Sequence, residues 1–272
     1  MIIDNTQRRC DPFLMDISNI NGKAWDGEAE NGSAWARIAS DEDIKEAREG
    51  KPELRVTIDK NIPLSWISGL QGKHVLSLGG GGGQQTPILA AYGCITTSVD
   101  CSHEMIERDR IALERFGLEA RLFVHDMSSL PFFSDSSFDA VISPVSLNFV
   151  EDIGKVYKEV RRILRPGGTY IFGIANPALY LFDDRLLAKG RMKIKYTLPF
   201  SDTKSLSEKE LRKRIARGDT VEFSHTLDTI LGSLTSLGFA ITGFFSDGSS
   251  FEPIDSFLQD CYLAVMAIRG ED

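Results

Sequence analysis

The chain has 272 residues and is 42% hydrophobic, which suits one large domain or one domain with an added segment. Its 31 basic and 39 acidic residues leave a net charge of −8, which argues against a general nucleic-acid binder. The four cysteines and four histidines show neither a CxxC pair nor metal-ligand spacing, so we expect no metal site and a reduced, cytoplasmic location. Residues 1–12 lack the apolar core of a signal peptide, and no uncharged run is long enough to cross a membrane.

Residues 1–70 show helical patterns and no strand pattern. Ser40 and Asp43 have the spacing of a capping box, which predicts a helix that runs to about residue 49. A short helix is expected within residues 62–70. We therefore expect residues 1–70 to form a helical cap on the rest of the chain, residues 71–272.

A strand, a glycine run, a helix and a second strand follow one another between residues 74 and 100. They cover His74–Leu78, Gly79–Gly83, Gln84–Tyr92 and Ile95–Val99, and Asp100 closes the second strand. A dinucleotide fingerprint needs glycines at positions i, i+2 and i+5, and no register of this run of five fits that spacing. Glycines between a strand and a helix let the backbone approach a ligand and aim free N–H groups at its polar or anionic parts. This stretch therefore predicts a ligand site.

Strands and helices continue to alternate as far as residue 175. The expected elements are a helix His103–Phe116 capped by Ser102, strands Glu119–His125 and Phe138–Ser143, a helix Glu151–Leu164, a sharp break at Arg165–Gly168 and a strand Thr169–Ala175. A last helix from Ser224 to Leu237 and strands Phe239–Phe245 and Cys261–Ile268 complete the chain. Alternation of this kind predicts an α/β fold built on a parallel sheet.

Residues 176–222 interrupt this order and form a predicted insertion. From Arg185 to Arg217 there are 11 basic and 3 acidic residues, but the excess of +8 falls to +4 over the window 183–222. Ser207 starts a second capping box. Basic residues at 193 and 195 alternate with Ile194 and Tyr196, and this alternation predicts a hairpin strand. We expect the insertion to lie over the mouth of the active site and contact the substrate, with a solvated surface excursion as the alternative.

Several of these segments resemble the class I S-adenosylmethionine (SAM) dependent methyltransferases. The resemblance rests on the alternating Gly79, Gly81 and Gly83, on LPFFSDSSFDAVIS before the fourth strand and on LRPGG before the fifth. The run GGGQQ, with L-x-G-K-x-V-L ahead of it and A-A-Y-G behind, is similar to a group of bacterial members of undefined substrate. The resemblance implies a Rossmann-like, seven-stranded mixed sheet with helices on both faces, SAM as cofactor and methyl transfer as the activity.

The resemblance also implies a set of cofactor contacts. Carried over residue by residue, they are Gly79, Gly80, Gly81, Gln84, Gln85, Asp100, Cys101, Ser102, Met105, Asp126, Met127 and Ser143. Asp100 would accept hydrogen bonds from the ribose hydroxyls, Asp126 and Met127 would lie at the adenine, and the glycines would bind the amino-acid tail. Core packing is the alternative for Met105, and a turn or cap is the alternative for Asp126. Many members have an acid two positions before the first glycine, where this chain has Ser77.

The methyl acceptor is less defined than the cofactor. Trp25, Trp35, Asn148 and Tyr180 are candidate substrate contacts, with simple packing as the alternative for the tryptophans. No catalytic residue is assigned beyond the candidates Asn148 and His225, and a structural cap is the alternative for His225. The sequence Ser143-Pro144-Val145-Ser146 lacks the second proline and the aromatic residue of enzymes that methylate DNA bases or glutamine amides. We therefore expect a small-molecule acceptor, and neither DNA nor a membrane as partner. The sequence does not define the oligomeric state. The alternatives are a tRNA or rRNA methyltransferase that uses the basic insertion, or a SAM-binding module without transfer activity.

Overall fold

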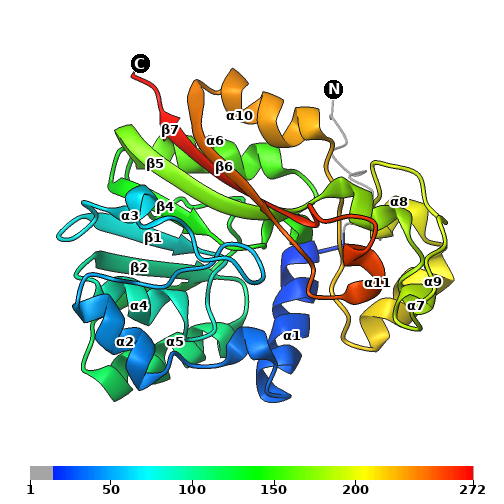
Figure 1. Cartoon of the computed structure of the whole chain (residues 1–272), viewed down its shortest axis with the longest axis horizontal. Helices are drawn as coiled ribbons and strands as arrows, with labels where there is room; N and C mark the ends of the chain where they lie inside the picture. Colours follow the sequence, from blue (N-terminus) through cyan, green and yellow to red (C-terminus); the bar gives the residue numbers. More distant parts are fainter. Residues whose placement is uncertain (1–14, 272) are drawn as a thin grey trace, which may run out of the picture.

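One seven-stranded sheet organises the computed structural model, which describes residues 15–271 (Figure 1). Cys10 and the residues assessed for a signal peptide lie outside this range. The strands are β1 (His74–Leu78), β2 (Ile95–Asp100), β3 (Ala120–Val124), β4 (Phe138–Ser143), β5 (Leu164–Ala175), β6 (Phe239–Asp247) and β7 (Tyr262–Arg269). Their order across the sheet is β3-β2-β1-β4-β5-β7-β6. Strands β1 to β5 pair in parallel, and β7 pairs antiparallel with both β5 and β6, which confirms the predicted mixed sheet.

Helices cover both faces of the sheet. The main ones are α4 (Gln85–Ala91), α5 (His103–Phe116), α6 (Ile153–Ile163) and the pair η4 (Asp228–Gly232) and α10 (Ser233–Ser236). Figure 1 shows α6 and α10 on one side of the sheet and α4 and α5 on the other. Because side chains of a strand alternate between faces, Leu76 and Leu78 of β1 join the core beneath α6, and Val75 joins the core beneath α4. Both faces of the central strands are therefore buried, as in other parallel sheets.

The N-terminal cap consists of short helices joined by irregular chain. They are α1 (Ile17–Glu30), η1 (Ala34–Ala36), α2 (Asp41–Arg48) and α3 (Leu64–Ile67), and residues 39–70 share a hydrophobic core with the sheet. The capping box at Ser40 is present, with Ser40 Oγ accepting from the N–H of Asp43 at 3.1 Å. Helix α1 lies against the start of α5, where Asp26 accepts a hydrogen bond from Ser102 Oγ at 2.6 Å. The cap is thus held on the loops at the carboxyl ends of the strands.

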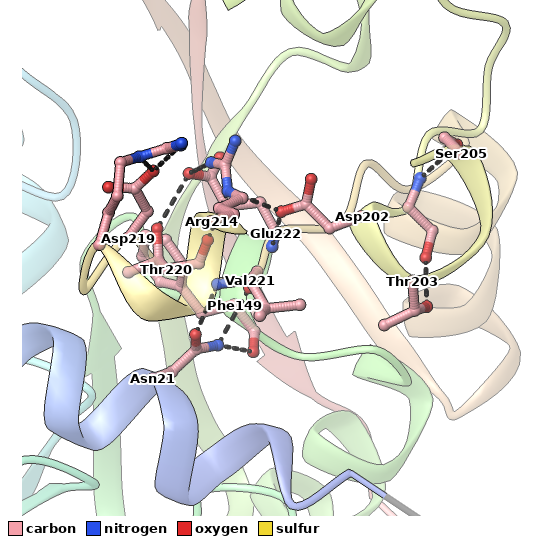
Figure 2. A network of polar contacts seen from close by, with 12 residues as sticks. Asn21, Phe149, Asp202, Thr203, Ser205, Arg214, Asp219, Thr220, Val221 and Glu222 are labelled. Carbon is pink, nitrogen blue, oxygen red and sulfur yellow. Dashed lines mark hydrogen bonds and ion pairs between the residues drawn. The ribbon is translucent and has the colours of Figure 1, made fainter. Parts of the chain in front are cut away.

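The insertion supports α1. It contains η3 (Pro177–Leu181), α7 (Asp184–Leu187), α8 (Asp202–Ser205) and α9 (Glu208–Ala216), and a separate short helix, α11 (Glu252–Asp255), lies between β6 and β7. Figure 2 shows Asn21 of α1 bonded to Val221 and Phe149. The Asn21 side-chain amide donates to both carbonyl oxygens at 3.0 Å and accepts from the N–H of Val221 at 2.7 Å. One buried amide therefore joins the cap, the insertion and the loop after β4.

Three local predictions differ from the structure. The hairpin strand expected at residues 193–196 is a single bridge between Phe182 and Ile194, and the Ile194 side chain is 68% exposed, so it contributes little apolar burial to such a strand. The last helix starts later than expected and opens with the wide turn of η4, where the Tyr157 hydroxyl donates to the carbonyl of Ile230. The break at Arg165–Gly168 lies inside β5, as a shift in its register with β4.

No helix within residues 15–271 combines the length and apolarity that crossing a bilayer requires.

Candidate active site

A cavity of about 740 Å³ lies at the carboxyl ends of β1, β2, β3 and β4. Its inner wall is made by the loops that follow these four strands, and its outer wall by the cap. The loops contribute Gly79, Gly80, Gly81, Gln84, Gln85, Asp100, Cys101, Met105, Asp126, Met127, Val145, Ser146 and Phe149, and the cap contributes Asn21, Trp25, Trp35, Arg55 and Asp59. The volume is within the range of small-molecule and cofactor sites, and the position is the usual ligand crevice of an α/β sheet.

The glycine run is held through its amide groups. Gly79 N–H donates to Val99 O at 2.7 Å, and Gly82 N–H donates to Met105 O at 2.9 Å. Gly81 and Gly83 donate to the carboxylates of Asp100 at 3.1 Å and Asp109 at 2.8 Å. Among the described residues, Gly80 N–H is the amide of this run without an intramolecular partner. Because Gly80 lines the cavity, its N–H is a free donor for a ligand.

Two buried side-chain oxygens without partners lie beside Gly80. They are Ser77 Oγ and Gln85 Oε1, and neither has a hydrogen-bond partner among the described residues. Gln85 lines the cavity, whereas Ser77 is fully buried directly behind Gly80 and is not a lining residue. A Cβ atom at Gly80 would lie 2.6 Å from the first oxygen and 3.3 Å from the second. The Gln85 amide is oriented by its Nε2, which donates to Arg55 O at 2.8 Å. Unpaired buried polar atoms cost free energy, so this cluster is suited to a polar ligand group.

Asp100 presents its carboxylate at the end of β2. It is only 8% exposed, and its two oxygens accept from the N–H groups of Gly81 and Ser102 at 3.1 and 3.0 Å. Burial raises the pKa of Asp100 to about 6, although these backbone hydrogen bonds act in the opposite direction. A carboxylate has about four acceptor positions, so each oxygen keeps one for a ligand hydroxyl. Asp100 can therefore accept from two neighbouring hydroxyls.

The segment after β3 forms the next part of the wall. Asp126 accepts from the N–H of Ser128 at 2.8 Å, so it does cap a turn, and it also lines the cavity. Met127 and Met105 add apolar surface on either side of the glycine run, and Cys101 follows Asp100. Burial raises the pKa of the Cys101 thiol well above its usual range, which disfavours the nucleophilic thiolate form.

Aromatic residues close the cavity on the cap side. Trp25 of α1 packs edge-on against Phe149, with ring centroids 5.3 Å apart, and both rings line the cavity. Trp35 lines it as well and is 47% exposed. Gln84 lines the cavity too, but its Nε2 donates to Ala34 O at 2.8 Å, which ties the cap to the glycine loop. Both predicted tryptophans are thus brought to the site.

Five predicted site residues lie outside the cavity lining. Ser102 caps α5 and donates to Asp26, and Ser143 Oγ donates to Leu78 O at 2.6 Å, which joins β4 to β1. Asn148 is buried between the N–H of Ala175 and the carbonyl of Phe223. Tyr180 donates to Glu222, and His225 Nε2 contacts Leu147 O. Each side chain is used to join neighbouring segments, so we assign none of them to the ligands.

The insertion also differs from its predicted role, because no described residue from 176 to 222 lines the cavity. Leu211 and Val221 instead form a small core with Ile17 and Ile20 of α1. The insertion therefore packs behind the cap and does not form part of the cavity wall.

Sequence reasoning missed several residues of the site. Ser146 and Phe149 follow β4, and their position after a central strand was an available signal. Arg55 and Asp59 had no signal, because they come from irregular chain in the cap. Asp109 was missed because it looks like one more charged residue of α5, and the structure places it fully buried behind the glycine run.

These groups fit the cofactor that the sequence resemblance implies. The ribose of SAM offers two neighbouring hydroxyls, which match the free acceptor positions of Asp100. Its amino-acid tail offers an ammonium and a carboxylate, which match the unpartnered oxygens of Ser77 and Gln85 and the free N–H of Gly80. The chemistry of the site therefore suits SAM even though an acid is replaced by Ser77.

Comparison with known proteins supports the same assignment. The family model of the methyltransferase domain matches residues 76–172. The chain is 37% identical over 249 residues to the Uncharacterized methyltransferase YbaJ of Bacillus subtilis, which covers 92% of this chain and 97% of that protein. The fold of this chain is similar to that of a SAM-dependent methyltransferase of Mesorhizobium loti, with a TM-score of 0.58 and 23% identity over 75% of this chain and 94% of the other. It is also similar to magnesium protoporphyrin IX methyltransferase of Synechocystis PCC 6803, solved with bound SAH, with a TM-score of 0.50 and 18% identity over 76% and 78% of the two chains. The chain belongs to the class I SAM-dependent methyltransferases, and SAM is its cofactor.

Proposed function

We propose that this protein transfers the methyl group of SAM to a small molecule held in the cavity between the cap and the sheet. The observation that carries the proposal is the composition of the cavity wall. The loops after β1, β2 and β3 supply cofactor-type groups, and the cap adds Trp25, Trp35 and other residues beside them. A site closed by a cap suits an acceptor small enough to lie inside it.

We assign the cofactor contacts to the inner wall. Asp100 is the proposed partner of the ribose hydroxyls, and Asp126 and Met127 lie where the adenine is expected. Gly80, Ser77 and Gln85 are the proposed partners of the amino-acid tail. When bound, SAM supplies an electrophilic methyl group on a positively charged sulfur.

The residues of this chain would act by holding the acceptor in line and by excluding water. Holding two reactants in a reactive geometry removes a large entropic part of the barrier, so a dedicated base is not required. Trp25, Phe149 and Trp35 offer apolar walls for the acceptor, and Ser146 offers a polar group after β4. Neither Asn148 nor His225 faces the cavity, so we do not assign a proton transfer to them.

Charge also favours a small acceptor over RNA. The cavity lining contains eight carboxylates and three basic side chains, which are Asp16, Asp43, Glu53, Asp59, Asp100, Asp126, Glu151 and Asp152 against Arg37, Arg55 and Lys155. Such a surface repels phosphate groups. In the insertion, five of the basic residues form ion pairs with acids, namely Lys195, Lys204, Arg212, Arg214 and Arg217. Fewer unpaired basic side chains of the insertion are therefore available to RNA.

Transfer of a tritiated methyl group from SAM would test the acceptor class. The purified protein is incubated with separate small-metabolite and RNA fractions of the host, and the Asp100→Asn variant serves as the background control. We expect label in the small-metabolite fraction only. Label in RNA, together with RNA binding that weakens as salt rises, would replace our proposal with the RNA alternative. SAM binding without a labelled product in either fraction would support a binding module instead.

A further inference from the structure

Asp109 is a buried carboxylate that does not line the cavity. It lies in the second turn of α5 and is 0% exposed. Within residues 15–271 it forms no ion pair with a lysine or arginine, and burial raises its pKa to about 7. Burying a carboxyl group costs free energy unless hydrogen bonds compensate for it, so the partners of Asp109 indicate what the residue does.

The partners of Asp109 indicate that role. One carboxylate oxygen accepts from the N–H of Gly83 at 2.8 Å. The other accepts from Thr86 Oγ1 at 2.6 Å and from Ser98 Oγ at 2.8 Å. These donors belong to the end of the glycine run, the first turn of α4 and β2. A single side chain of α5 thus joins the three elements that shape the cofactor loop.

Gly83 also connects this carboxylate to the cap. Its carbonyl accepts from the N–H of Ala39 at 2.7 Å. Its φ is +84°, and a Cβ there would lie 3.0 Å from Ile38 and from the carbonyl of Arg108, so this peptide has little freedom to move. The hydrogen bond to Asp109 therefore fixes both the end of the glycine run and one attachment point of the cap.

We propose that Asp109 is a positioning residue that holds the glycine run in its cofactor-binding shape while leaving the N–H of Gly80 free. The inference rests on the proposed cofactor contacts at Gly80. Asp109 acts through Gly83 and Thr86 and does not touch the cofactor. Asp109 of α5 thus orders the glycine run. Strand β1, which leads into that run, carries Ser77 at the position where many family members have an acid.

Asp109→Leu tests the proposal, since leucine has a similar branched shape and accepts no hydrogen bond. We expect its Kd for SAM, measured by calorimetry, to rise at least tenfold. Asp109→Asn should stay within about threefold of the wild type, because its Oδ1 can still accept from Gly83 and its Nδ2 can donate to the two hydroxyls. Ser98→Ala is the matched control, since it removes one bond to the same carboxylate and leaves both loop bonds. Its Kd should stay within twofold.

Hydrogen exchange of the Gly83 amide gives a second readout that does not need SAM. We expect the amide to exchange at least tenfold faster in Asp109→Leu than in Ser98→Ala. If Asp109→Leu does not fold, Thr86→Val replaces it, and an increase of at least threefold in Kd is expected. A folded Asp109→Leu protein with wild-type exchange at Gly83 and wild-type SAM affinity overturns the inference. If the wild type itself fails to bind SAM, the proposed function fails, and the exchange result still decides whether Asp109 holds the loop.

Discussion

Replacing Asp100 by asparagine should weaken SAM binding. The change keeps the shape of the side chain but removes its charge and one of its two acceptor oxygens. In the free protein each oxygen of Asp100 already accepts one backbone N–H, so the second position of each is available to the ribose. A hydrogen bond to a charged group contributes about 1.5–3 kcal/mol. Loss of one such bond corresponds to an increase in Kd of about 10- to 150-fold, at about 1.4 kcal/mol for each factor of ten.

The same substitution should leave the stability of the free protein unchanged or higher. Burial raises the pKa of Asp100 to about 6 from 3.8, so the carboxyl group holds its proton more tightly in the folded chain than in the unfolded chain. The stability that this adds is present below about pH 4 and is lost as pH rises through about 6. This rise in the pKa of Asp100 corresponds to roughly 3 kcal/mol against the charged form at neutral pH. Asparagine avoids this cost but leaves one backbone N–H facing its NH₂ group, which offsets part of the gain.

Calorimetry with SAM and thermal unfolding, both at pH 7.5, would measure the two effects. Asp139→Asn is a suitable control, because Asp139 is a carboxylate at the amino end of β4 that accepts from the N–H of His74 and pairs with Arg165. We expect this control to lose stability and keep its affinity for SAM. An Asp100→Asn protein that binds SAM within twofold of the wild type would falsify our placement of the ribose.

Two further substitutions test the tail cluster and the anchoring of the cap. Ser77→Ala removes a buried hydroxyl that has no partner among the described residues, so we expect the free energy of unfolding to stay within about 1 kcal/mol of the wild type while the Kd for SAM rises about fivefold or more. An unchanged Kd would remove Ser77 from the cofactor site. Asn21→Ala leaves the backbone groups of Phe149 and Val221 without their partner, so we expect a loss of about 2–3 kcal/mol in thermal unfolding. The exposed Asn19 on the same helix gives the control Asn19→Ala, and equal losses in the two variants would contradict the anchoring role.

Local signals in the sequence predicted much of the fold. The strand Phe138–Ser143 has the bounds that were expected, and both capping boxes, at Ser40 and Ser207, are present. These features depend on residues close together in the chain, where hydrogen-bond geometry and apolar spacing decide the outcome. The class of cofactor was predicted from the resemblance of several segments to class I methyltransferases, whereas the glycine run by itself predicted only a ligand site.

Polar residues near strand ends were harder to assign. Ser143 and Asn148 follow the expected pattern of ligand contacts, yet one joins β4 to β1 and the other bridges Ala175 and Phe223. Spacing along the chain does not tell whether such a side chain points into the cavity or toward a neighbouring strand. The insertion posed the same problem, since its packing on α1 depends on Asn21, about 200 residues away from Val221. Long-range contacts of this kind leave no local pattern.

A crystal structure of the protein with S-adenosylhomocysteine would test the central claim most directly. We predict that the two ribose hydroxyls lie within hydrogen-bond distance of the Asp100 carboxylate. We also predict that the amino-acid tail lies against the N–H of Gly80 and the oxygens of Ser77 and Gln85. A ligand bound outside the cavity between the cap and the sheet, or one whose ribose lies away from Asp100, would contradict the account.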